Sequence, residues 1–150
     1  MMAAMVVLVG LLAAPAWAQE ESSNADREWM VDLSTDLTEC AGYHYAAADR
    51  FAQAGMADEA QLAQDYGNGA VMAGSWVLVL LEVMNPLEAV EYVEKNAAGR
   101  RAHWRARFKD RNNPMIEKQW ADCDAIGPYQ EELVKQARRA VLLNRPRPTD

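Results

Sequence analysis

This sequence of 150 residues lacks the short motifs that most directly indicate a particular reaction or cofactor. There is no Cys-x-x-Cys-His for covalent haem, no Gly-x-Ser-x-Gly or His-Glu-x-x-His for hydrolysis, and no glycine-rich loop that would cradle a phosphate. Segments with the apolar and polar alternation of β-strands are also missing. These absences argue against the familiar enzyme classes and against a β-sheet, so we predict a non-enzymatic, all-α protein.

Basic residues are scarce in the first half of the chain. From residue 20 to residue 94 there are fifteen acidic side chains and two basic ones, whereas from residue 95 onward there are thirteen basic and seven acidic. The net charge of the whole chain is −7, which argues against non-specific nucleic-acid binding. Because the two halves carry opposite charge, we expect them to attract each other when the helices pack.

An uncharged apolar segment opens the chain and is followed by a small-x-small pattern. Residues 3–14 are apolar or glycine, and Ala16-Trp17-Ala18 follows Pro15. This pattern is typical of a cleaved signal peptide, residues 1–18, although no Lys or Arg precedes the apolar run. We therefore predict a periplasmic or secreted protein, with a retained N-terminal anchor as the alternative.

A second apolar segment, Gly69 to Met84, is interrupted only by Ser75 and Glu82. Its uncharged run, residues 66–81, is shorter than the roughly 20 apolar residues that a spanning helix needs, so we predict a buried helix and no stable membrane span. Glu82 would then be a buried charge that needs an arginine of a later helix, a ligand or solvent as its partner.

Apolar residues recur at alternating spacings of three and four in most of the remaining chain, which predicts four helices joined by short connections. The predicted fold is an up-and-down four-helix bundle over residues 28–143. Residues 19–27 are expected to form a flexible leader, and residues 144–150 a disordered tail.

Three short sequences mark where the predicted helices begin, end or bend. Asn85-Pro86-Leu87-Glu88 has the pattern of a capping box and predicts the start of the third helix. Gly67-Asn68-Gly69 weakens the second helix, which we predict to continue with a kink there. Gly127-Pro128 should kink or split the fourth helix, since proline lacks an amide donor.

The two cysteines, Cys40 and Cys123, fall near the middle of the first and fourth predicted helices. In an exported protein such a pair is normally oxidised, so we predict a disulfide between these two helices. Cys40 and His44 are four residues apart on one helical face, and with Cys123 they form an alternative metal site. Haem held by His44 or His103 with a methionine is a further alternative; our prediction is that no cofactor is bound.

A basic segment forms the second half of the third predicted helix. Its six positive residues either pair with the acidic first helix and Glu82 or present a surface to a partner. The predicted function is therefore binding of an unidentified protein or small ligand through a charged helical face, and the alternative is a metal- or haem-binding bundle that uses His44. The candidate partner-binding residues are Arg100, Arg101, Arg105, Arg107, Lys109 and Arg111.

Overall fold

The computed structural model describes residues 16–110 and 112–143. These residues form four α-helices and no β-strand, which confirms the predicted all-α fold. None of the helices in the described ranges combines the length and apolar character that a membrane crossing requires. The helices are α1 (Ala16–Gln53), α2 (Ala57–Leu80), α3 (Pro86–Arg107) and α4 (Pro114–Leu143).

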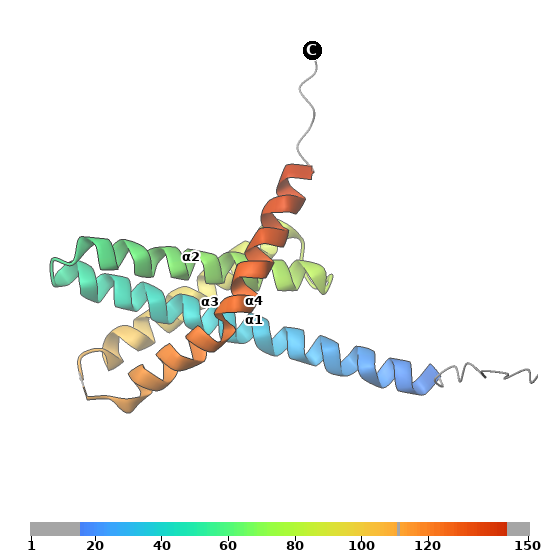
Figure 1. The fold of residues 1–150 in the computed structure, drawn as a ribbon, viewed down its shortest axis with the longest axis horizontal. Helices are drawn as coiled ribbons and strands as arrows, with labels where there is room; N and C mark the ends of the chain where they lie inside the picture. Colours follow the sequence, from blue (N-terminus) through green and yellow to red (C-terminus); the bar gives the residue numbers. More distant parts are fainter. Residues whose placement is uncertain (1–15, 111, 144–150) are drawn as a thin grey trace, which may run out of the picture.

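Figure 1 shows that α1 and α2 form an antiparallel pair, that α3 returns beside them, and that α4 crosses the other helices obliquely. The fourth helix packs more extensively on α2 than on α1. A regular up-and-down arrangement is therefore not confirmed. The helix α2 runs unbroken through residues 67–69 and α4 continues through Pro128, so neither is split there, and the predicted kinks are not confirmed.

The first helix begins earlier than the sequence predicts. The expected leader, residues 19–27, lies within α1. This segment contains neither proline nor glycine, so extending the helix through it carries no large propensity cost. Most of the predicted signal peptide (residues 1–15) and all of the predicted tail (residues 144–150) lie outside the described residues, and cleavage after Ala18 stays a prediction.

The connection between α2 and α3 corrects the prediction for Glu82. The second helix ends at Leu80, so Glu82 lies in the following turn with a φ of 56° and an exposed side chain. It needs no buried partner because water solvates its carboxylate. The capping box that follows is confirmed: Asn85 Oδ1 accepts hydrogen bonds from the backbone amides of Leu87 (3.1 Å) and Glu88 (3.0 Å).

Small residues allow α1 to lie close to α2 and α3. Alanines are buried on α1, α2 and α3, and two glycines mark the tightest approaches. A Cβ atom added to Gly67 would lie 2.5 Å from the ring of Tyr45, and one added to Gly42 would lie 2.9 Å from the backbone of α3. The largest fully buried side chains fill the space around these contacts: Leu37, Cys40, Val77, Val93 and Trp104.

The close approach of α1 and α3 gives a matched pair of predictions. Gly42→Ala should lower the free energy of unfolding by about 1–3 kcal/mol, because the new methyl group meets backbone that cannot turn aside. Gly99→Ala should raise it by about 0.5–1 kcal/mol, because Gly99 is inside α3 with nothing within 4 Å of the added atom. Urea denaturation of both variants measures the difference. Equal effects would contradict the helix packing described here.

Candidate functional site

The predicted disulfide is confirmed and lies at the crossing of α1 and α4. Cys40 and Cys123 are bonded, with their Cα atoms 5.6 Å apart, and both are buried. The amide Nε2 of Gln119 lies 3.4 Å from Cys123 Sγ. This bond uses both thiols of the alternative metal site. No group of three or more potential metal ligands is found within the described residues.

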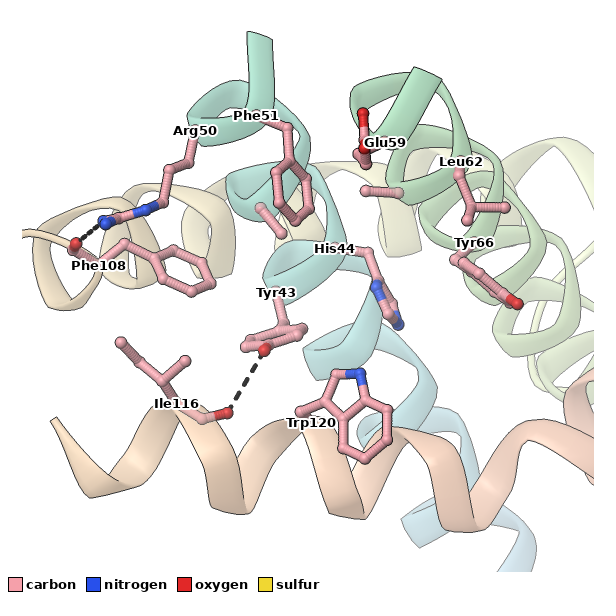
Figure 2. A pocket seen from close by; sticks show the side chains of 12 residues that line it. Tyr43, His44, Arg50, Phe51, Glu59, Leu62, Tyr66, Phe108, Ile116 and Trp120 are labelled. Atoms are coloured by element: carbon pink, nitrogen blue, oxygen red, sulfur yellow. Dashed lines mark hydrogen bonds between the residues drawn. The ribbon is translucent and has the colours of Figure 1, made fainter. Parts of the chain in front are cut away.

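A groove of about 590 Å³ opens beside the disulfide, where α1, α2 and the first half of α4 meet (Figure 2). His44 follows Cys40 by one turn of α1, and Trp120 precedes Cys123 by one turn of α4, so the disulfide fixes the separation of these two walls. The wall side chains are mainly aromatic or aliphatic: Tyr43, His44, Phe51, Leu62, Tyr66 and Trp120.

Aromatic contacts hold the floor of the groove in place. The Tyr43 ring packs edge-on against Trp104, with 5.2 Å between ring centroids, and its hydroxyl donates a hydrogen bond to the Ile116 carbonyl (3.3 Å). Tyr43 therefore connects α1 to the buried side of α3 and to the start of α4. Burial raises the pKa of the Tyr43 hydroxyl, which keeps it a neutral donor.

His44 is an aromatic wall residue of this groove. Its ring stacks on Tyr66, with centroids 5.4 Å apart, and meets Tyr43 edge-on. Burial lowers the pKa of His44 from 6.5 to about 4, because the charged imidazolium is poorly solvated there. The ring is therefore neutral at pH 7 and offers a flat apolar face and one nitrogen acceptor.

The rim of the groove leaves large apolar side chains in contact with water. Leu62, Tyr66 and Trp120 are 57%, 52% and 56% exposed. Trp120 precedes the buried Cys123 by one turn, yet it is exposed because α4 crosses obliquely and turns this residue toward the groove mouth. The groove could not be predicted from the sequence for the same reason. Tyr66 and Trp120 are evident there as aromatic residues, but the sequence does not bring them together.

Arg50 forms the end of the groove nearest α3. Its guanidinium donates a hydrogen bond to the Phe108 carbonyl, drawn as a dashed line in Figure 2, and lies 6.0 Å from the centre of the Phe108 ring. Phe108 caps α3 and is buried. These contacts place a half-buried positive charge against an otherwise apolar wall.

The basic segment of α3 is used largely inside the protein. Arg100 pairs with Glu39 at 3.0 Å, and Arg101 and Arg105 both pair with Asp49 of α1. The predicted attraction between the acidic first helix and the third helix is confirmed for these three arginines. It does not extend to Glu82, which is exposed in the turn before α3.

The other three candidate partner-binding residues form no ion pair that the structure describes, and their surroundings differ. Arg107 lies over the ring of Trp104, 5.1 Å from its centroid. Lys109 is exposed beyond the end of α3. Arg111 lies outside the described residues.

Comparison with known proteins gives no family or relative for this chain. No family model matches it, and neither a curated protein nor a solved structure matches it. Its function is therefore inferred from the groove, the nearby charges and the disulfide.

The Asp49 ion pairs give a prediction about pH. The pKa of Asp49 falls from 3.8 to about 2, chiefly because Arg101 donates hydrogen bonds to its carboxylate, with a further contribution from Arg105. A lowered native pKa contributes stability above pH 4 that is lost as the pH falls through 2. Asp49→Asn should therefore lower the free energy of unfolding by about 1–2 kcal/mol at pH 7.

That difference between wild type and Asp49→Asn should shrink as the pH falls from 4 to 2, because the wild-type carboxyl then becomes protonated. Urea denaturation at several pH values measures it. The control is Asp124→Asn, which removes an exposed carboxylate in the middle of α4 that forms no ion pair with a described residue, and which should change the free energy of unfolding little at every pH. A difference for Asp49→Asn that stays constant down to pH 2 would contradict the ion-pair account.

Proposed function

We propose that this small disulfide-bonded helical protein is exported and binds a small ligand without chemically changing it, with the aromatic groove as the binding site. The observation that carries this proposal is the groove itself. Its volume of about 590 Å³ falls within the range of small-molecule sites, and its walls are aromatic and aliphatic with few polar groups. The Cys40–Cys123 bond supports export, because such bonds persist in oxidising compartments.

The exposed rim supports a ligand with an apolar body. Large apolar side chains gathered around one hollow are typical of binding sites, whereas isolated exposed apolar residues are common on any protein. Leu62, Tyr66 and Trp120 come from two different helices and line the same groove. Each 100 Å² of apolar surface that a ligand covers contributes about 2.5 kcal/mol before the costs of association.

The chemistry of His44 favours binding over catalysis. A general base has to be within reach of its substrate and is usually oriented by a second polar group. The His44 ring instead stacks on Tyr66 and meets Tyr43 edge-on, and its pKa of about 4 makes it a weak base. These features suit recognition of a flat or aliphatic surface.

The groove is a stronger candidate than the charged helical face predicted from the sequence. Three of the six basic residues of that face, Arg100, Arg101 and Arg105, already pair with carboxylates of α1. The metal alternative has lost the thiols of Cys40 and Cys123 to the disulfide. We therefore place the ligand in the groove and treat partner binding by Arg107 and Lys109 as the second candidate.

The neutral aromatic dye N-phenyl-1-naphthylamine tests this proposal. We expect one saturable binding site, measured from the fluorescence of the dye. Trp120→Ala should weaken binding about tenfold, because losing roughly 50 Å² of apolar contact costs about 1.3 kcal/mol. The matched control is Tyr92→Ala, which removes an aromatic side chain of similar exposure (50%) from α3 outside the groove.

Binding that Trp120→Ala leaves unchanged, or that both variants weaken equally, would place the dye elsewhere and contradict the proposed site. Far-ultraviolet circular dichroism of each variant checks that the helices are intact.

A further inference from the structure

We infer that the natural ligand of this groove is a small apolar organic anion, whose negative group is bound by Arg50 and Lys109 while its apolar body lies against Trp120 and His44. This inference rests on the proposed function and adds the charge and polarity of the ligand. It comes from the position of the groove beside a second, basic hollow.

The second hollow, of about 500 Å³, lies between α1 and the end of α3. It shares two of its lining residues, Arg50 and Phe108, with the aromatic groove. The two spaces are therefore adjacent, and the side chain of Arg50 is accessible to both. Aromatic residues line the groove, whereas most of the charged residues line the second hollow.

The charges that line the second hollow are unequal. The basic residues Arg50, Arg105 and Lys109 face a single carboxylate, Asp49. That carboxylate is already bound by Arg101 and Arg105. Within the described ranges, neither Arg50 nor Lys109 has a carboxylate within 4.0 Å. Two positive charges are thus available at this end of the site.

Arg50 is suited to bind an anion at this position. A guanidinium carries five N–H donors in a rigid plane, and the Phe108 carbonyl accepts from one of its terminal nitrogens. The same contact and the Phe108 ring hold the side chain in one orientation, so less conformational entropy is lost when an anion binds. Because Arg50 is half-buried, its charge is screened less than that of a fully exposed residue.

The end of the groove away from Arg50 has a negative side chain in place of a positive one. Glu59, the carboxylate among its lining residues, comes from α2 and not from the α1–α3 side. Figure 2 shows Arg50 and Glu59 on opposite sides of Phe51. A ligand with one negative group at one end of an apolar body therefore has a single favourable orientation, with its anion toward Arg50.

Two dyes that share one aromatic body test the charge of the ligand. N-phenyl-1-naphthylamine is neutral, and 8-anilinonaphthalene-1-sulfonate carries one added sulfonate. We expect the full-length oxidised protein to bind the sulfonate dye about tenfold more tightly, since hydrogen bonds from charged groups are the stronger ones. The measured quantity is the ratio of the dissociation constant of the neutral dye to that of the sulfonate dye. Raising the salt concentration from 0.05 to about 0.5 M should reduce this ratio, because salt screens the attraction between the sulfonate and the basic side chains.

Variants of the two basic residues then locate the anion. Arg50→Gln and Lys109→Gln should each lower the ratio about threefold, and Arg50→Lys should retain most of it because the charge remains. The matched control is Lys95→Gln, which removes an exposed positive charge from α3 outside both hollows and should leave the ratio unchanged.

The possible failures are distinguishable. If neither dye binds, both the proposed function and the anion preference are overturned. If both dyes bind equally, or if the ratio does not respond to Arg50→Gln and Lys109→Gln, only the anion preference is overturned. A ratio that falls equally in Lys95→Gln would show non-specific attraction to positive charge and would also overturn the assigned site.

Discussion

The covalent bond between Cys40 and Cys123 determines where α4 crosses α1, and the candidate site depends on that crossing. The bond joins residues 83 positions apart and contributes about 4–5 kcal/mol in the chain-entropy model. Apart from Cys123 and Ala137, the apolar residues of α4 that pack on the core are only partly buried. The disulfide adds to this packing and keeps Trp120 opposite His44.

Between α1 and α3, ion pairs add to the apolar packing. Asp49 accepts from two arginines, and Glu39 pairs with Arg100 while also accepting a hydrogen bond from the buried Trp104 indole at 2.6 Å. Gly42 allows the close approach that these contacts require. Because the carboxylates of α1 are used in this way, Arg50 is left as a positive charge between the helical interface and the groove.

Sequence reasoning predicted the local features well and the orientation of α4 poorly. The Asn85 capping box and the disulfide were predictable because each depends on residue types at particular places in the sequence. Glu82 was misplaced because helical periodicity does not locate the last residue of an apolar helix. The exposure of Trp120 depends on the angle at which α4 crosses α1, which follows from long-range packing and from no single motif.

If the disulfide holds α4 as one wall of the proposed binding groove, ligand binding should depend on the oxidised state. The most direct test is the dissociation constant of the neutral dye for the oxidised protein and for the same protein after reduction, with free thiols counted in both samples. Reduction should weaken binding at least about tenfold, because the Trp120 wall is no longer held opposite His44. Equal affinity in the two states, with both thiols shown to be free after reduction, would contradict the claim.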